Sequence, residues 1–241
     1  MKIFLTISVL LIAVYSFGQS VVGKSVADVA KDFDSYYVFK QKEAGLFRTV
    51  FVKGTDDKAE YLYAYSNKDG VIKIQLDKTL LFPDGNYYGM IDSTVVESQA
   101  DFVNGYAIVA AGDELGLLYG EAKFGAIDST GKLIVEPRFF QLGSFSEGLA
   151  AYSESIDDRI ESGYINTKGE KEIILPESLS RLYMRCYFKG DNFENGIAKM
   201  QIVQNNHDCN CSSTIVINRQ GKILKQDGAI LDAGYKEIFL D

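Results

Sequence analysis

The stretch FGAIDSTGKLIVEPRFFQLGSFSEGLAAY, residues 124–152, decides the fold that this sequence predicts. A strand-like run leads into the DSTG turn at residues 128–131, where an aspartate can hydrogen-bond the turn backbone and glycine can adopt a left-handed conformation. A second apolar run follows, and the FSEG segment at residues 145–148 leads into a strand of small residues. The pattern predicts a β-hairpin with a bulge and then a tight turn into the next strand.

Both elements recur in the same order before and after this stretch. The central isoleucines of the first element stand at positions 91, 127, 165 and 217, and the phenylalanines of the second at 102, 145 and 193. A unit of this size cannot bury its own apolar face, so the units are expected to stack on one another. The residues expected to carry the repeat are Gly89, Ile91, Phe102, Gly105, Gly125, Ile127, Asp128, Gly131, Phe145, Gly148, Gly163, Ile165, Gly169, Phe193, Gly196, Ile217 and Gly221.

The composition agrees with a β-rich chain. Its 241 residues include 15 Tyr, 15 Phe and 22 Gly against 3 Pro, which favours strands and tight turns over a helical bundle. Strand-like runs at residues 46–53 and 60–66 precede the first readable unit. In the second run, Tyr61, Tyr63 and Tyr65 alternate with smaller residues, so their rings are expected to pack on one strand face.

The predicted fold is therefore all-β, a repeat array of β-hairpins arranged as a solenoid or as part of a propeller, with a short N-terminal helix. The β-repeat domain is expected at residues 46–241, with units that begin at about residues 88, 124, 162 and 214. A helical cap segment is expected at residues 19–45, where Ser25 and Asp28 form a capping-box pattern. Apolar residues at helical spacing predict a helix from about 26 to 42, although the apolar run 36–39 is also compatible with a strand. This helix is expected to cover an end of the array.

The N-terminus has the marks of a secretory signal peptide. Lys2 precedes the uncharged, mostly apolar run 3–15, and small residues stand before an expected cleavage point between Gly18 and Gln19. The run is shorter than the roughly 20 residues that a membrane-spanning helix needs. Residues 1–18 are therefore expected to be removed, and the mature chain to be secreted or periplasmic with no membrane span.

The marks within residues 124–150 resemble those of the WG (KWG) repeat family. They are the pairs Phe124-Gly125, Ile127-Asp128 and Gly131-Lys132, the VEPRF run at 135–139 and the FSEGLA run at 145–150. The resemblance covers roughly residues 88–224. The family's tryptophan is replaced by Tyr88 in the first unit and by Phe124 in the second, and the units that begin at Ser162 and Thr214 have no aromatic residue at this position. It implies an all-β repeat fold, found in bacterial proteins, that has no established catalytic activity and is generally regarded as an interaction module.

One stretch has the residue types of a metal site. His207, Cys209 and Cys211 are candidate ligands for zinc or copper. The spacing lacks the two-residue gap of zinc knuckles and no second cluster completes four ligands, so neither a metal site nor a cofactor is predicted. In an exported protein, a disulfide between Cys209 and Cys211, or from one of them to Cys186, is the main alternative, and free or buried thiols are another.

Three pairs of adjacent carboxylates are the catalytic candidates that the sequence offers. A glycosidase needs two carboxyls on opposite sides of a sugar, one of them with a raised pKa. The pairs in this sequence lie in loop-like contexts, where charge is normally solvated, and no nucleophile elbow, phosphate loop or calcium loop occurs, so no catalytic residue is predicted. The pairs are Asp56-Asp57, Asp113-Glu114 and Asp157-Asp158.

The expected function is that of an exported, non-enzymatic repeat scaffold that binds another protein or a cell-envelope polymer. A formal net charge of −8 disfavours nucleic-acid binding, because an acidic surface repels phosphates. Two alternatives remain at the level of sequence. One is a secreted glycan hydrolase that uses carboxylates in a groove of the array, and the other is a metal-handling protein that uses His207, Cys209 and Cys211.

Overall fold

The computed structural model describes residues 20–39, 45–55, 59–83, 99–112, 121–157, 159–175, 186–190, 192–206 and 209–228. In these ranges the chain forms four sheets of four strands, each an antiparallel meander in sequence order. Sheet 1 contains β1 (Ser35–Phe39), β2 (Leu46–Lys53), β3 (Glu60–Asn67) and β4 (Ile72–Gln75), and sheet 2 contains β5 (Leu80–Leu81), β6 (Tyr106–Ala111), β7 (Lys123–Asp128) and β8 (Leu133–Phe139). Sheet 3 contains β9 (Gln141–Leu142), β10 (Leu149–Ile156), β11 (Arg159–Asn166) and β12 (Lys171–Ile174), and sheet 4 contains β13 (Cys186–Gly190), β14 (Ile197–Asn206), β15 (Cys209–Asn218) and β16 (Ile223–Gly228).

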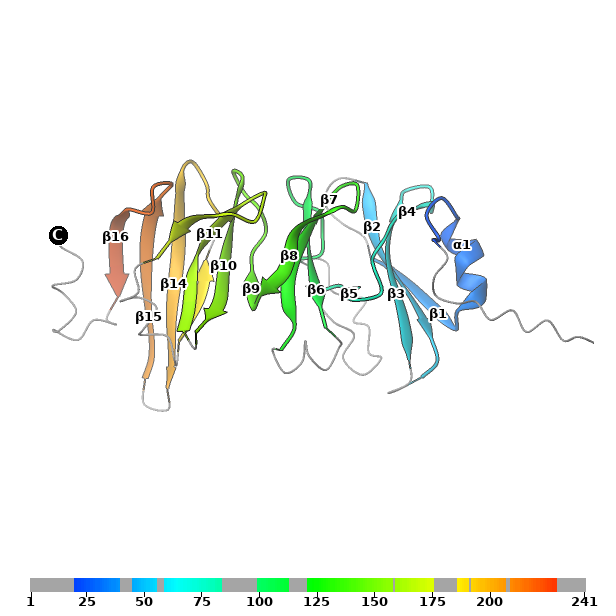
Figure 1. Ribbon diagram of the computed structural model, residues 1–241, viewed down its shortest axis with the longest axis horizontal. Coiled ribbons are helices and arrows are strands. Elements are labelled where there is room, and N and C mark those ends of the chain that lie inside the picture. Colours follow the sequence, from blue (N-terminus) through cyan, green and yellow to red (C-terminus); the bar gives the residue numbers. More distant parts are fainter. Residues whose placement is uncertain are drawn as a thin grey trace, which may run out of the picture.

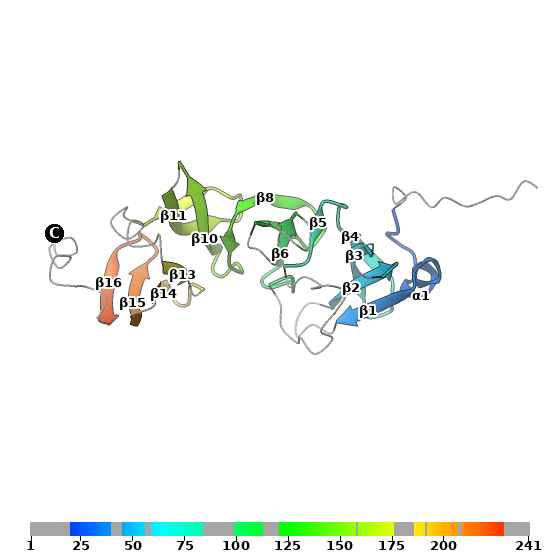
Figure 2. The same cartoon turned by 90° about the horizontal axis from the view of Figure 1, so that it is seen from below.

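The four sheets follow one another along the long axis of the molecule, in sequence order (Figure 1). Helix α1 (Val26–Val29) lies at one end and β16 at the other, and the view from below shows the same succession (Figure 2). The described part of the chain is therefore an open array whose two ends lie apart. This confirms the predicted all-β repeat array with a short N-terminal helix.

Apolar side chains fill the space between each sheet and the next. The phenylalanine of the second repeat element and the alanine five residues after it lie together in each of these cores, so the same packing is present in three copies. Phe102, Phe145 and Phe193 are 2%, 1% and 0% exposed, and burying a phenylalanine stabilises a fold by about 1.5–3 kcal/mol. The pairs are Phe102 with Ala107 between sheets 1 and 2, Phe145 with Ala150 between sheets 2 and 3, and Phe193 with Ala198 between sheets 3 and 4.

The tyrosines of β3 belong to the first of these cores. Tyr63 and Tyr65 are buried, and Tyr61 is half-buried against the same cluster, as the alternating pattern predicts. The Tyr65 hydroxyl donates a hydrogen bond of 2.7 Å to the Ala100 carbonyl oxygen, which satisfies its polar end inside the core.

The N-terminal helix is shorter than the spacing predicts. The Ser25 hydroxyl caps α1 by accepting a hydrogen bond of 3.0 Å from the Asp28 N–H, and the helix gives way to a 3₁₀ turn at Ala30–Asp32. The prediction that it continues to residue 42 is wrong, because the aromatic and β-branched run 36–39 pairs with β2 as strand β1. Val26 and Val29 pack with Phe51 on the outer face of sheet 1, so the helix covers an end of the array as expected. Among the described residues, no helix has the length and apolar character needed to cross a membrane.

The sequence repeat is offset from the sheets by two strands. The unit at residues 124–152 supplies β7 and β8 of sheet 2 and then β9 and the start of β10 of sheet 3. Each unit therefore ties one sheet covalently to the next. Sheet 1 has the same build, with an NKDG turn at residues 67–70, so the repeated architecture begins upstream of the first predicted unit. The predicted repeat residues Gly89 and Ile91 lie outside the described residues.

Candidate binding surface

Four hairpin turns of the pattern [DN]-x-x-Gly lie at one end of the sheets. In each turn the Asx side-chain oxygen accepts backbone N–H groups two and four residues further on; for Asn166 these bonds measure 2.9 Å to Lys168 and 3.1 Å to Glu170. At Asp128 the Thr130 hydroxyl also donates, and this hydrogen bond holds the pKa of the carboxyl below its usual range. A register shift follows each turn, which confirms the predicted bulge. The turns are residues 67–70, 128–131, 166–169 and 218–221.

Three turns of the pattern Phe-x-x-Gly lie at the same end. Their third residues, Asn104, Glu147 and Asn195, have φ values of 52°, 50° and 54°, and the glycine that follows each is also left-handed. Two successive left-handed residues form the turn whose twist matches a β-hairpin. Register places these turns beside the Asx turns, because the residue after each glycine pairs with the Asx residue of the next turn: Tyr106 with Asp128, Leu149 with Asn166, and Ile197 with Asn218.

The turns of sheets 2, 3 and 4 are hydrogen-bonded to one another. The Asn104 side-chain amide donates to the Phe145 carbonyl oxygen at 2.9 Å, and the Ser146 hydroxyl donates to the Phe193 carbonyl oxygen at 2.7 Å. The Glu147 carboxylate accepts the Gly196 N–H at 3.1 Å. These bonds join the turns of sheets 2, 3 and 4. Together with the Asx turn of sheet 1, which lies at the same end of the sheets, these turns form what we call the turn surface: residues 67–70, 102–105, 128–131, 145–148, 166–169, 193–196 and 218–221.

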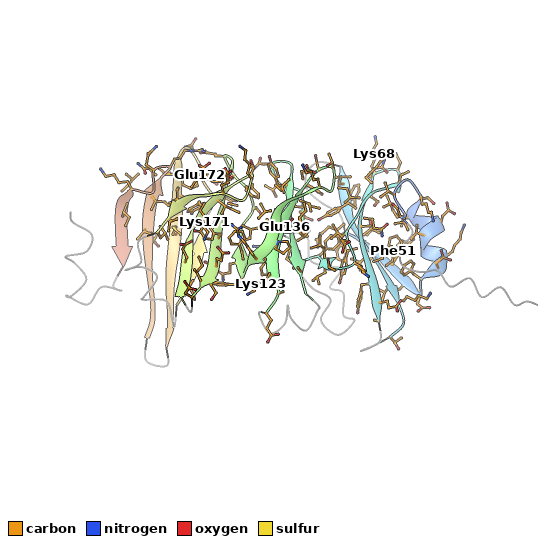
Figure 3. The ribbon with its side chains drawn as sticks, viewed as in Figure 1. Phe51, Lys68, Lys123, Glu136, Lys171 and Glu172 are labelled. Atoms are coloured by element: carbon orange, nitrogen blue, oxygen red, sulfur yellow. The ribbon has the colours of Figure 1, made fainter. Side chains whose placement is uncertain are left out.

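The turn surface has a constant framework and variable outward positions. The Asx residue and the glycine recur in all four Asx turns, where the Asx side chain accepts backbone hydrogen bonds and the glycine has a positive φ. The two positions between them differ in every turn and are exposed or half-buried: Lys68-Asp69, Ser129-Thr130, Thr167-Lys168 and Arg219-Gln220. Lys68 lies at the end of the strands where the turns gather, and Lys123 lies at the opposite end of the strands (Figure 3). A fixed frame that presents different side chains from each repeat is the arrangement by which repeat proteins build binding faces.

A second polar feature lies on the adjacent strands β10, β11 and β12 of sheet 3. Glu154 and Glu161 face each other across β10 and β11, and the Lys171 ammonium lies 2.8 Å from one carboxylate and 2.6 Å from the other. The Tyr152 hydroxyl donates to Glu161 at 2.7 Å, and the Arg138 guanidinium lies 3.3 Å from Glu154. Figure 3 labels Lys171 on this sheet. Sequence reasoning missed this cluster, because strand pairing rather than chain proximity brings its members together.

The electrostatics of this cluster are those of a neutralised ion network. Burial acts to raise the pKa of Glu161, but hydrogen bonds from Lys171 and Tyr152 outweigh it and the pKa is lowered. Burial acts to lower the pKa of Lys171, but its bonds to Glu154 and Glu161 outweigh it and the pKa is raised. Burial, followed by the neighbouring Glu161, raises the pKa of Tyr152. A glycosidase acid needs a raised carboxyl pKa, whereas that of Glu161 is lowered.

Lys171→Met is expected to destabilise the protein by about 1 kcal/mol at pH 7, after allowance for solvent screening. The variant leaves two carboxylates facing each other with the Lys171 ammonium removed. Because the fold lowers the pKa of Glu161, the stability that this group contributes is present at neutral pH and is lost as the pH falls through the folded pKa. The difference in unfolding free energy between Lys171→Met and the wild type should therefore shrink below about pH 4. Urea unfolding at pH 7 and below about pH 4 measures this difference, with Lys168→Met at an exposed turn as the control. An equal loss of unfolding free energy at the two pH values would contradict the prediction.

The structure describes one of the six carboxylates in the three candidate pairs. Asp157 is an exposed turn residue between β10 and β11. The other members, Asp56, Asp57, Asp113, Glu114 and Asp158, lie outside the described residues, and so does His207. Within the ranges that the structure describes, no three side chains of His, Cys, Asp or Glu are grouped as metal ligands would be.

The three cysteines lie on strands of sheet 4. Cys186 in β13 and Cys211 in β15 both pair with Gln204 of β14, one from each side. They are therefore two strand spacings apart, about 9.5 Å, whereas a disulfide needs Cα atoms within about 7 Å. Cys209 lies further along β15. The register thus argues against a bridge from Cys186, and it leaves a Cys209–Cys211 disulfide and free thiols as the alternatives.

Comparisons with known proteins identify one segment. Residues 124–154 match the family model described as WG containing repeat. Comparison with curated proteins found no significant match. Among solved structures, the chain is similar to prolyl oligopeptidase B from Galerina marginata, at 11% identity and a TM-score of 0.45 over 82% of this chain and 27% of that one. It is also similar to a eukaryotic initiation factor, at 10% identity and a TM-score of 0.36 over 81% of this chain and 55% of that one.

The chain thus spans about a quarter to a half of the length of these structures. The match at residues 124–154 falls on the stretch that carries the resemblance, and it confirms that resemblance. Strands β7 to β10, which link sheet 2 to sheet 3, are formed by a WG repeat.

Proposed function

We propose that the protein is an exported, non-enzymatic repeat scaffold that binds a protein or a cell-envelope polymer through the turn surface. The observation that carries this proposal is the division of the turns into a constant framework and variable outward positions. The Asx residues and glycines fix the backbone of each turn, so the exposed side chains are presented by a rigid support. Binding to a preformed surface loses less conformational entropy than binding that orders a loop.

The connections between turns support the same proposal. Arg219 donates to the Glu147 carbonyl oxygen at 2.9 Å, which links the turns of sheets 3 and 4, and Arg138 donates to the Gly169 carbonyl oxygen at 3.1 Å, which links sheets 2 and 3. A ligand that contacts several turns would therefore meet side chains held at fixed spacing. Export rests on the apolar run 3–15 and the small residues before Gln19.

The proposal is tested by a pull-down from cell-envelope extract with three baits that begin at Gln19. One bait is the wild-type chain, one carries Lys68→Glu and Lys168→Glu on the turn surface, and one carries Lys53→Glu and Lys123→Glu at the opposite end. Both double variants change exposed lysines, so the net charge changes equally. Circular dichroism melts establish that all three fold alike.

A protein or polymer captured by the wild type and by the opposite-end variant, but at least about tenfold less by the turn variant, would support the proposal. Equal capture by all three baits, or loss with the opposite-end variant alone, would place binding elsewhere and contradict it. Capture by none would contradict a scaffold for the components of that extract.

A further inference from the structure

Strand β1 is an edge strand with an open side. In the described part of the chain it pairs with β2 alone, through residues 35–39. An edge strand presents N–H and C=O groups that no neighbouring strand uses, and these groups can pair with a strand from another chain. Tyr36 and Val38 are 48% and 46% exposed and lie on the same face of β1, opposite Phe51 and Thr49 of β2.

The other described edge strands carry features that prevent such pairing. β5 and β9 contain two residues each, which is too short to serve as a template. β8 contains Pro137 between two charged residues, and the remaining edges carry at least one charged residue: Lys73 in β4, Lys171 and Glu172 in β12, Lys189 in β13, and Lys225 and Asp227 in β16. The β1 sequence, SYYVF, has neither charge nor proline. β1 is thus the described edge strand that lacks protection.

The exposed side chains of β1 are held in place. The Tyr36 ring stacks on Phe51 with ring centroids 6.1 Å apart, and Phe51 itself is fully buried under the N-terminal cap. On the opposite face of β1, Phe39 is buried and Tyr37 is half-buried against the core between sheets 1 and 2. The strand is therefore anchored on one face, and it offers an ordered aromatic and a β-branched side chain on the other.

We propose that β1 pairs antiparallel with β1 of a second copy of this chain, in the register centred on Tyr37. In this register Tyr36 lies opposite Val38 of the partner subunit, and Val38 lies opposite the partner's Tyr36. Aromatic and β-branched residues form favourable cross-strand pairs, and the two-fold symmetry makes each pair occur twice. The two four-stranded sheets join into one sheet of eight strands.

The sequence around β1 favours a second copy over an unrelated strand. Tyr36 and Val38 stand one residue on either side of Tyr37, so an antiparallel pair about Tyr37 sets the exposed aromatic side chain of each copy opposite the exposed β-branched side chain of the other. Two paired strands of five residues form an interface well below the usual ~800 Å² per partner, and the net charge of −8 repels a second copy. The dimer is therefore weak, with a dissociation constant on the order of 10 µM, and it strengthens as salt screens the repulsion.

Sedimentation equilibrium of the chain from Gln19, from about 1 µM to about 500 µM, tests the proposal. The wild type should show a monomer–dimer equilibrium, and Val38→Lys should weaken it by about tenfold because it disrupts both Tyr–Val pairs. The matched control is Ile174→Lys, a 56% exposed apolar residue on the edge strand β12, and it should leave the equilibrium unchanged. Thermal melts of the three proteins establish that the folds are equally stable.

A double variant, Tyr36→Glu with Val38→Lys, tests the register itself. About Tyr37 the two introduced charges of one copy face the opposite charges of the other, so dimerisation should recover by about fivefold over Val38→Lys at low salt and lose that gain at high salt. A monomer at every concentration would overturn the proposal, as would a dimer that Val38→Lys leaves intact or that Ile174→Lys disrupts. None of these lysine or glutamate substitutions lies on the turn surface, so this result and the capture experiment can fail independently.

Discussion

Gly163→Ala is expected to destabilise the protein by about 2–4 kcal/mol, although it adds a single methyl group. Gly163 lies in the middle of β11, and a Cβ at this position would overlap the Ile173 carbonyl oxygen and lie 2.9 Å from its carbonyl carbon in β12. These are backbone atoms of a paired strand, so they cannot move aside without disturbing the ladder between β11 and β12. The equivalent glycine of the WG repeat, Gly125, meets the Val135 carbonyl oxygen and Pro137 in the same way.

Two other glycines of the same region provide matched controls. At Gly143 a Cβ would meet Ala151 at 3.7 Å, an ordinary contact, so Gly143→Ala should change the unfolding free energy by less than about 1 kcal/mol. At Gly148 no atom lies within 4 Å but φ is +80°, so Gly148→Ala should cost about 1 kcal/mol through the backbone alone. Urea unfolding of the three variants measures whether their losses of unfolding free energy follow this order, with Gly163→Ala the largest and Gly143→Ala the smallest. If Gly163→Ala were no worse than Gly148→Ala, the close approach of β12 would not be the reason for the glycine.

Local chemistry predicted the hairpins of this fold well. The Asx side chain and the glycine of each [DN]-x-x-Gly turn fix the backbone without help from distant residues, so the turn and its bulge follow from four neighbouring letters. The helix boundary was predicted wrongly because a non-local contact decides it. Residues 36–39 fit a helical spacing, but their pairing with β2 supplies hydrogen bonds and packing that the spacing does not reveal.

Features made by strand pairing were not accessible from the sequence. Glu154 and Glu161 are seven positions apart, yet the β10–β11 register sets them directly opposite with Lys171 between them. Sheet 1 was placed in the β-repeat domain but was not recognised as a repeat unit, because its sequence has the Asx turn at Asn67 without a Phe-x-x-Gly partner ahead of it. The turn surface was predictable turn by turn but not as a surface, since hydrogen bonds such as that from Asn104 to Phe145 join residues 41 positions apart.

The second large effect is expected at the buried ion pair between sheets 1 and 2. The Arg48 Nε atom lies 2.7 Å from an Asp101 oxygen, and the two side chains are 2% and 11% exposed. Arg48 comes from β2 and its guanidinium lies 4.7 Å from the centre of the Phe39 ring, whereas Asp101 comes from the segment that leads into β6. The pair therefore joins two sheets inside a low-dielectric core.

Asp101→Ala should destabilise the protein by about 3–5 kcal/mol, because it leaves the Arg48 charge buried without its carboxylate. Arg48→Met combined with Asp101→Ala removes both charges, and an apolar replacement of a buried pair is often tolerated, so the double variant should be more stable than Asp101→Ala alone. Urea unfolding of both single variants and the double variant gives a coupling free energy of about 2 kcal/mol or more. The control is Lys31→Met, which breaks the exposed pair with Asp28 at the same 2.7 Å distance and should have no measurable effect. A coupling near zero would mean that Arg48 and Asp101 stabilise the junction of the two sheets independently, through their separate contacts rather than through each other.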